Sequence, residues 1–354
     1  MKHIRLIVIR IFIISIIASL LFTKYQTKAE NCGQAEPVLI PILIYHRVIQ
    51  KVSSIYDYTP EQLEEQLKYF KENGYSPITA LQMVEMMECP ELLPEKPVVL
   101  TFDDGHKSHY TSVFPLLKKY GCKGTFFIYT NVIAEKSEKQ LTWAELREMQ
   151  RDGMDIQSHT KSHPYLTRTL KNESNQAYKK RIIHEFKDSK DIIEKHLQHK
   201  VELLAYPYGW FNQTIETLAV QAGYRGIFTV NWGTNLLSEN LLRIKRRVME
   251  NTMTIGDLEI ILTARPFTVE VIYPEDAGIF TQAPEIKFKI IDSTTDRVEI
   301  KVRSLVDTIP QDKDGIFTWS GLKKLRPGYH MIVIKGHDDN NRPSIFSWGF
   351  DYKY

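Results

Sequence analysis

The chain has 354 residues, of which 43% are hydrophobic, 11% aromatic and 25% charged, with 17 glycines and 16 prolines. This composition is typical of a globular protein and excludes a collagen-like repeat, a disordered chain and a small disulfide scaffold. Subtracting the five basic residues of the first 29, which contain no acidic residue, lowers the formal net charge from +3 to about −2, so the remaining chain lacks the clustered Lys and Arg of a nucleic-acid-binding protein.

A basic start followed by the apolar, uncharged run Ile11 to Phe22 is typical of a secretory signal peptide. Thr27 and Ala29 offer small residues at the −3 and −1 positions of a cleavage site. The run is shorter than the about 20 apolar residues of a spanning helix, so cleavage is favoured over an uncleaved membrane anchor. Both alternatives predict a protein that is secreted or held on the outer face of the membrane or wall, with membrane contact only through residues 1–29.

The length predicts about two domains, and the first is expected over residues 37–262. Short β-prone runs alternate there with helical patterns, two of which begin with the capping boxes Thr59 to Gln62 and Thr142 to Glu145. Expected strands are 38–45, 98–102, 125–129, 154–157, 201–206 and 226–230, and expected helices lie near 60–73, 112–120, 143–152, 176–199 and 214–222. This alternation predicts an α/β fold with a parallel sheet covered by helices, an irregular (β/α) barrel with its chemistry at the carboxyl ends of the strands.

The second domain is expected over residues 266–354, where the pattern changes to alternating apolar and polar residues. The clearest runs are 268–271, 285–290, 297–302 and 329–334, and turn residues separate them. Half-buried antiparallel strands at this spacing predict a small all-β sandwich, an immunoglobulin-like accessory domain. The three cysteines, Cys32, Cys89 and Cys122, have irregular spacing and predict neither a disulfide framework nor a cysteine zinc site.

Polar residues follow three of the expected strands. Asp103 and Asp104 are adjacent acids at the end of one strand, and such a pair is either a plain turn or a charged site that a cation stabilises. His159 and His163 follow another strand, and two histidines with one carboxylate leave coordination positions open on a metal ion. The turn at Tyr208 can point a backbone N–H at developing negative charge. Because strand ends of a parallel sheet meet at one face, these groups are expected to converge.

In this order and spacing, Thr101–Gly105, His159 with His163, and Tyr206–Gly209 resemble the polysaccharide deacetylase family, carbohydrate esterase family four. The similarity covers about residues 41–258. Leu43–Arg47 near its start is similar to the branch that deacetylates the poly-N-acetylglucosamine adhesins of biofilms, and so are Arg246 and Val248 near its end.

This resemblance implies that Asp103 is a catalytic general base and that Asp104, His159 and His163 bind a divalent metal. Zinc is the first candidate for that ion, with Co²⁺, Ni²⁺ and Fe²⁺ as alternatives. The backbone N–H of Tyr208 is then expected to stabilise the oxyanion.

Two positions depart from the family pattern. The family's Leu-x-His proton donor is missing after Gly209, and His46 is the candidate replacement; the alternative is that His46 only hydrogen-bonds within the barrel mouth. Ala205 stands where many relatives have an arginine that orients the catalytic aspartate. Either Arg246 reaches Asp103 from another strand or the aspartate is tuned less tightly.

The candidate substrate contacts are Trp232, Trp210 and Arg246, with the two tryptophans offering stacking faces for sugar rings.

The expected function is metal-dependent hydrolysis of the acetamide of N-acetylglucosamine residues in an extracellular poly-N-acetylglucosamine, with release of acetate. Peptidoglycan and chitin oligomers are alternative substrates because they carry the same reacting group. A different class of function, a catalytically weak protein that binds glycan at the cell surface, is motivated by Ala205 and the missing motif. The sequence leaves the oligomeric state open.

Overall fold

A computed structural model describes residues 37–353 except 135 and 324. The predicted leader, its cleavage site and Cys32 lie outside the described residues. Residues 39–354 form one compact unit. Among the helices that the structure describes, none has the length and apolar character needed to cross a membrane.

The first part of this unit is built on an eight-stranded sheet in which all neighbouring strands are parallel. The strand order is β7-β6-β5-β4-β3-β1-β8, and β2 pairs with β3. A bridge between Phe228 and Ile244 joins β7 to the segment just before β8, so the two edges of the sheet approach each other. The predicted irregular (β/α) barrel is therefore confirmed. The strands are β1 (Ile42–Tyr45), β2 (Ser76–Ile78), β3 (Pro97–Asp103), β4 (Thr125–Ile128), β5 (Asp155–Ser158), β6 (Leu203–Ala205), β7 (Gly226–Phe228) and β8 (Arg247–Val248).

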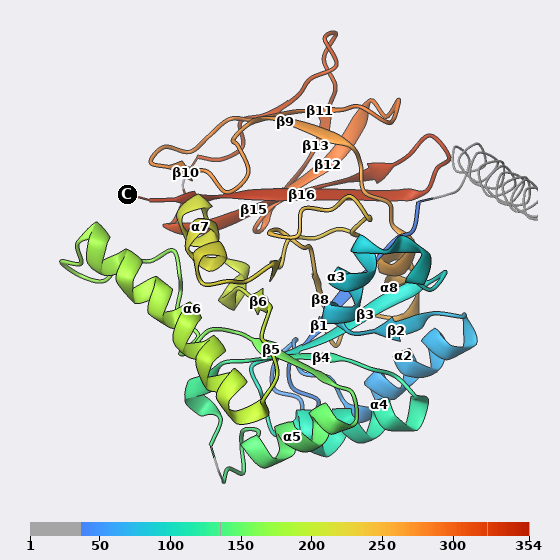
Figure 1. The fold of residues 1–354 in the computed structure, drawn as a ribbon. Helices are drawn as coiled ribbons and strands as arrows, with labels where there is room; N and C mark the ends of the chain where they lie inside the picture. The colour runs from blue at the N-terminus through green and yellow to red at the C-terminus, as the bar shows by residue number, and fades with distance from the viewer. Residues whose placement is uncertain (1–36, 135, 324, 354) are drawn as a thin grey trace, which may run out of the picture. The chain divides into compact units, whose positions relative to one another are not determined.

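The helices alternate with these strands as expected. Thr59 with Gln62 and Thr142 with Glu145 form reciprocal capping boxes that begin α2 and α5, because each threonine oxygen accepts an N–H bond that the first helical turn leaves unpaired. Figure 1 shows α2, α4 and α5 along one side of the sheet. The helices are α2 (Pro60–Glu72), α3 (Ala80–Glu88), α4 (Phe114–Tyr120), α5 (Trp143–Arg151), α6 (Asn175–Leu197), α7 (Gln213–Gln221) and α8 (Ile255–Thr263).

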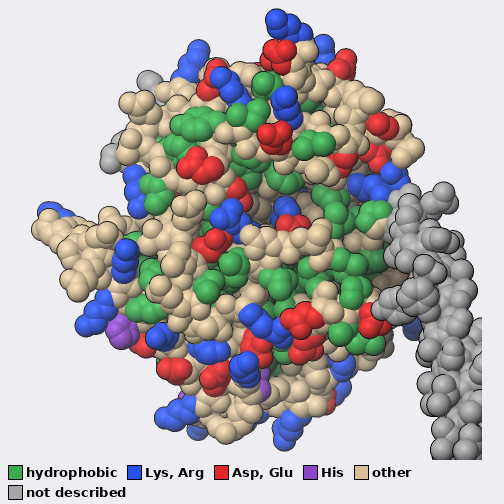
Figure 2. Space-filling view, turned by 45° about the horizontal axis from the view of Figure 1, so that its top comes forward, with side chains coloured by type: hydrophobic (Ala, Val, Ile, Leu, Met, Phe, Trp, Pro, Cys, Tyr) green, Lys and Arg blue, Asp and Glu red, His purple; other side chains and the backbone are tan. Residues whose placement is uncertain are grey.

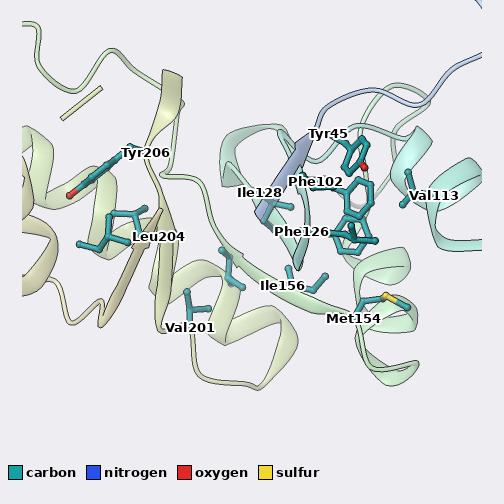
Figure 3. Close-up of a cluster of buried hydrophobic side chains, with 14 of the residues drawn as sticks. Tyr45, Phe102, Val113, Phe126, Ile128, Met154, Ile156, Val201, Leu204 and Tyr206 are labelled. Atoms are coloured by element: carbon teal, nitrogen blue, oxygen red, sulfur yellow. The ribbon is translucent and has the colours of Figure 1, made fainter. Parts of the chain in front are cut away.

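The barrel core is aromatic at its centre. Tyr45 of β1, Phe102 of β3 and Phe126 of β4 lie on adjacent strands, and their rings stack at centroid distances of 5.3 and 4.9 Å (Figure 3). All seven residues of β3 are buried, so this strand lies in the interior of the barrel. Burying one such ring contributes about 1.5–3 kcal/mol, which keeps the end of β3 in a fixed position.

The C-terminal region consists of two further sheets. One has the strand order β10-β16-β15-β12-β13 and the other β14-β11-β9. Phe288 of β11 contacts Trp348 of β16 at 5.6 Å between ring centroids, so the two sheets face each other across an apolar core. This is the expected all-β architecture. The strands are β9 (Val269–Tyr273), β10 (Ile279–Phe280), β11 (Ile286–Ile290), β12 (Arg297–Val302), β13 (Leu305–Pro310), β14 (Phe317–Trp319), β15 (Gly328–His337) and β16 (Pro343–Tyr352).

The five-stranded sheet also contacts the barrel. Tyr329 of β15 donates a hydrogen bond of 2.8 Å from its hydroxyl to the side chain of Asn231. The Trp210 ring lies directly over Gly328, where a β-carbon would come within 2.6 Å of it. These contacts bring β15 to the barrel loops that follow β6 and β7. The division into domains at about residue 266 stays a prediction.

Candidate active site

Five strand ends of the barrel surround one cavity of about 490 Å³. His46 follows β1, Asp103 ends β3, His159 follows β5, Tyr208 lies just after β6, and Val230 lies just after β7. The convergence expected from the sequence is therefore present. The cavity is lined by Ile44, His46, Tyr56, Asp103, Asp104, His159, His163, Tyr206, Tyr208, Val230, Trp232, Arg247, Val248, Glu250 and Met331.

Asp104, His159 and His163 form a compact group of possible metal ligands. The two imidazole Nε2 atoms are 3.1 Å apart, and they lie 3.7 Å (His159) and 3.3 Å (His163) from Oδ1 of Asp104. Ligand atoms that share a tetrahedral ion at usual zinc bond lengths lie roughly 3.4 Å apart. The spacing of these three side chains thus fits a single ion.

The donor atoms are also free to bind a cation. His159 donates its Nδ1–H to the carbonyl oxygen of Ala205 at 2.8 Å, which leaves a lone pair on Nε2. Burial lowers the pKa of His159. The pKa of His163 is lowered to about 4 by burial and by the nearby His159. Both rings are therefore neutral near pH 7. Oδ1 of Asp104 is buried and has no hydrogen-bond partner within the described chain. A buried carboxylate oxygen without a donor fits a site that a metal ion completes.

The backbone at two ligands is strained. Asp104 has φ 80° and His163 has φ 59°, a region that costs residues with a β-carbon about 1–3 kcal/mol. The loop that carries His163 is held by Glu185 of α6, whose carboxylate accepts the N–H groups of Lys161 and Ser162 at 3.1 and 2.8 Å and the Ser162 hydroxyl at 2.7 Å. These bonds stabilise a conformation that aims the imidazole at Asp104.

Asp103 lies beside the three ligands and is paired with Arg246. The two guanidinium nitrogens Nη1 and Nη2 donate to Oδ1 and Oδ2 of Asp103, both at 2.9 Å, and Oδ2 lies 3.9 Å from Nε2 of His159. Burial by itself raises the pKa of Asp103, but the charges of Arg246 and His159 outweigh it and bring the pKa to about 2. Asp103 is therefore ionised at neutral pH, as a proton acceptor must be.

Arg246 resolves the alternative that the sequence left open, because it reaches Asp103 from the segment before β8. It has no exposed surface, and its remaining donors bond to the Thr229 carbonyl and the Thr101 hydroxyl at 3.0 and 3.2 Å. The guanidinium thus lies behind the carboxylate and outside the cavity lining. This placement does not favour the expected direct contact with substrate, and it gives Arg246 the position of the missing orienting arginine.

His46 lines the same cavity as the three candidate ligands. Its Nδ1 is buried, and its imidazole makes no hydrogen bond within the described chain. The nearest aromatic ring is Tyr56, at 5.8 Å between centroids. No hydrogen bond within the described chain holds the His46 side chain, and its role as proton donor stays a prediction.

The turn after β6 presents Tyr208 to the cavity. Its backbone has φ 59°, its N–H bonds to no other described group, and its ring is 44% exposed. The next residue, Gly209, has φ 69°, and a β-carbon there would lie 2.2 Å from the Val230 side chain, so only glycine fits. The Gly209 backbone therefore packs closely against Val230.

The two tryptophans are placed differently. Trp232 lines the active-site cavity, but Arg247 lies over its ring at 3.8 Å, and Lys301 and Lys335 lie at 5.1 and 5.5 Å. Trp210 lies outside this cavity, in a neighbouring groove. A stacking role for either ring stays a prediction.

Comparison with known proteins finds similarity to deacetylases. Residues 92–227 match the sequence model of the polysaccharide deacetylases. This matched region is thus similar to the polysaccharide deacetylases. The deacetylase region resembles the putative polysaccharide deacetylase YxkH of Bacillus subtilis, with 29% identity over 60% of this chain and 71% of YxkH.

Two further relatives extend this comparison. The poly-β-1,6-N-acetyl-D-glucosamine N-deacetylase of Escherichia coli K12 is 28% identical over 48% of this chain, but the match spans only 30% of that enzyme. The Streptococcus pyogenes deacetylase PplD, solved in complex with acetate, superposes with a TM-score of 0.58 and 29% identity, over 64% of this chain and 99% of PplD. Family and structural neighbours together indicate an N-deacetylase hydrolase.

Several residues of the active-site cavity were not expected from the sequence. Tyr56 lies in the loop after β1, Glu250 follows β8, and Met331 comes from β15 in the C-terminal region. Glu250 follows the segment of Arg246 and Val248 and could have been found from that motif. Met331 carries no local signal, because only the contact between β15 and the barrel brings it to the site.

Proposed function

We propose that this chain is a metal-dependent N-deacetylase that acts on N-acetylglucosamine residues of a poly-N-acetylglucosamine-type polysaccharide outside the cell. The proposal rests on one observation: possible metal-ligand atoms of Asp104, His159 and His163 lie close together. Beside them lies the carboxylate of Asp103, which Arg246 keeps ionised. The relatives named as poly-N-acetylglucosamine deacetylases support this polymer as the substrate, and the leader-like residues 1–29 support an extracellular location.

Six residues of the cavity have a role in this proposal. A divalent ion held by Asp104, His159 and His163, with zinc as the first candidate, supplies Lewis-acid chemistry and acidifies water. Asp103 accepts a proton from the water that adds to the acetamide carbon. The Tyr208 N–H donates to the carbonyl oxygen as it gains negative charge.

Cleavage of the C–N bond then needs a proton on the leaving nitrogen, and His46 donates it. The products are acetate and a glucosamine residue with a free amine, so all atoms of the water are accounted for. Arg246 touches neither product; it holds both oxygens of Asp103 and thereby orients the base.

An acetate-release assay on defined glycans tests the proposal. Purified protein with added Zn²⁺ should release acetate from β-1,6-linked N-acetylglucosamine oligomers, and a chelator should abolish the release. Asp103→Asn should lower kcat at least about 100-fold, the usual contribution of a general base. The matched control is Asp152→Asn, which makes the same carboxylate-to-amide change at the C-terminal cap of α5, where Asp152 pairs with Lys118. This variant should keep full activity.

Parallel assays on peptidoglycan and chitin oligomers identify the polymer. Absence of acetate from all three glycans in the metal-loaded wild type would contradict the proposal. If glycan is retained equally by wild type and by His159→Ala/His163→Ala without acetate release, the chain is a glycan-binding protein instead.

A further inference from the structure

A second cavity of about 650 Å³ continues from the active site toward the C-terminal sheets. The continuity is direct, because both cavities are lined by Tyr56, Tyr208, Val230, Trp232 and Met331. We call this second cavity the groove. A polymer bound with one acetamide at Asp103 would place neighbouring sugar units in it.

The end of the groove near the active site is aromatic. The rings of Tyr208 and Tyr165 are stacked at 4.0 Å and are nearly parallel, with an angle of 10° between them. Trp210 adjoins Tyr165 at 4.7 Å between centroids. The Arg168 guanidinium lies over the Tyr165 ring at 4.0 Å, so this aromatic group positions a basic side chain beside the groove.

The groove also carries four basic side chains. Lys301 and Arg303 come from the end of β12 and the turn after it, Arg326 precedes β15, and Arg168 belongs to the barrel loop after His163. Among the described residues, no aspartate or glutamate lines the groove. Three of the four side chains are exposed and Lys301 is half-buried, so their charged ends can reach a ligand.

These four cations have no acidic partner in the described part of the chain, unlike their neighbours. On the same sheet Lys335 pairs with Glu299 at 3.3 Å. Burial and the nearby Arg326 lower the pKa of Arg303, which indicates like charges close together without an anion between them. The acid of the adjoining cavity, Asp351, is 1% exposed and already bonded to Asn212. The cluster therefore has a local excess of positive charge.

This excess is not general to the protein surface. On the face that Figure 2 shows, basic and acidic side chains are interspersed. A local group of like charges beside a catalytic cavity raises the concentration of a ligand of opposite charge there. The placement of the four cations thus points to a negatively charged group on the bound molecule.

We propose that the groove is a subsite for an anionic group, a carboxylate or a phosphate, carried by the glycan within a few sugar units of the acetamide that is hydrolysed. The inference rests on the proposed function and narrows its substrate class. Deacetylation leaves an amine that takes up a proton, so a neutral poly-N-acetylglucosamine becomes a polycation that the four basic groups repel. A glycan with acidic groups remains attracted after each turnover, so poly-N-acetylglucosamine-type chains that carry acidic groups are preferred over neutral ones.

The test compares acidic and neutral oligosaccharides in a charge-removal variant. Arg303→Gln/Arg326→Gln removes two of the four charges. The matched control, Arg297→Gln/Lys313→Gln, removes two exposed charges from the same all-β region outside the groove lining. The substrates are a tetrasaccharide of alternating N-acetylglucosamine and N-acetylmuramic acid, a phosphate-bearing N-acetylglucosamine oligomer, and a neutral β-1,6-linked N-acetylglucosamine tetramer.

We expect wild type to prefer an acidic substrate, and the groove variant to lower the acidic-to-neutral ratio of kcat/KM about tenfold. The control should keep the wild-type ratio, and added salt should lower the ratio in wild type. The carboxylate and phosphate substrates separate the two sources of negative charge. A ratio that is the same in wild type, groove variant and control would overturn the inference.

Binding separates this inference from the proposed function. Affinities of the same three oligosaccharides are measured by fluorescence anisotropy in an Asp103→Asn background, where turnover does not interfere. If wild type releases no acetate but the groove charges still set the preference for acidic ligands, the proposed function fails and the subsite stands. If acetate is released but the groove variant binds all three oligosaccharides with wild-type affinity, the subsite is contradicted and the proposed function stands.

Discussion

A single buried arginine determines the chemistry of Asp103. The carboxylate is almost fully buried, and an isolated carboxylate at that depth takes up a proton because its charged form loses its hydration. Two hydrogen bonds from the planar guanidinium of Arg246 reverse this effect and also fix the direction of both oxygens. Arg246 thus keeps Asp103 ionised from the segment before β8, while position 205, where the family resemblance implied an orienting arginine, is an alanine.

Removing this arginine should change the pH dependence of catalysis. In Arg246→Met the raising effect of burial on the pKa of Asp103 is no longer offset, so the acid limb of the kcat/KM profile should move to higher pH and kcat should fall more than KM changes. Arg246→Lys keeps one charge but not the two-pronged geometry, and an intermediate shift is expected. Rates are measured by acetate release from pH 4 to 8 with metal added.

Thermal unfolding of both variants is recorded first, because breaking a buried ion pair costs roughly 3–5 kcal/mol. A folded Arg246→Met protein with the wild-type pH profile would contradict the positioning role. Loss of activity at every pH with no shift of the acid limb would indicate only a structural role.

At the scale of elements, α6 supports the candidate metal site through the carboxylate of Glu185. Glu185 bonds to the loop of residues 160–163, and that loop carries His163 in its strained conformation. The helix begins with the cap Ser174 and packs its apolar side on the barrel, so it is a rigid support. The position of His163 thus depends on α6, a helix that contributes no candidate ligand itself.

Glu185→Gln should therefore weaken metal binding without removing a ligand. The amide loses the charge that three donors share, and the loop relaxes from its left-handed backbone. By analogy with supporting residues at other metal sites, affinity for Zn²⁺ should fall about 10–100-fold. Competition with a fluorescent zinc chelator measures this affinity directly, and excess Zn²⁺ should restore acetate release.

Asp191→Asn is the matched control, because it removes an exposed carboxylate from the same helix six residues further on. Equal zinc affinity in Glu185→Gln and Asp191→Asn would show that the loop does not need this support. Weaker affinity that excess metal fails to rescue would point to a wider collapse of the loop.

Helices that begin at a capping residue were predictable from the sequence. Strands that form only through pairing with a neighbouring strand were not. The helices after Thr59 and Thr142 begin where their capping residues indicate. The strand Ser76–Ile78 was missed because three residues with a central proline carry no periodicity, and it exists through its pairing with the start of β3. The long strand Pro343–Tyr352 was missed because its serines and glycine interrupt the alternation, although its pairing with β15 is continuous.

The site was predictable to a similar extent. Adjacent acids and paired histidines at strand ends indicated the ligand group, because carboxyl ends of parallel strands share one face. The partnership of Arg246 with Asp103 remained one of two alternatives, since the closing segment of a barrel has no periodic pattern. The basic groups of the groove could not be found, because Arg303 and Arg326 meet Arg168 only through the contact of the five-stranded sheet with the barrel.

For the whole molecule, that contact makes the C-terminal sheets part of the binding surface. Met331 lines both cavities, and Ser347 of β16 donates a hydrogen bond of 2.5 Å to the carbonyl of Trp232. Residues 39–354 form one compact unit in which the barrel supplies the reacting groups and the sheets supply much of the groove. The stability of both parts then bears on catalysis.

Global stability should fall as the pH is lowered from about 6.5 to about 4 because of His109. This residue is fully buried in the barrel, its Nε2 lies 2.7 Å from the carbonyl oxygen of His46, and burial lowers its pKa to about 4. An unfolded histidine, with a pKa of about 6.5, takes up a proton in this range while the folded one stays neutral, so the unfolded state binds more protons and is favoured. The full effect is about 3 kcal/mol, present above pH 6.5 and lost toward pH 4.

Urea unfolding of the metal-free protein at pH 7.5, 6 and 5 measures this change in the free energy of unfolding. His109→Gln keeps a side chain that can donate to the His46 carbonyl but cannot take up a proton, so its unfolding free energy should fall less between pH 7.5 and 5. His184→Gln replaces an exposed histidine of α6 and should behave as wild type. If the free energy of unfolding has the same pH dependence in wild type and His109→Gln, groups other than His109 govern stability in acid.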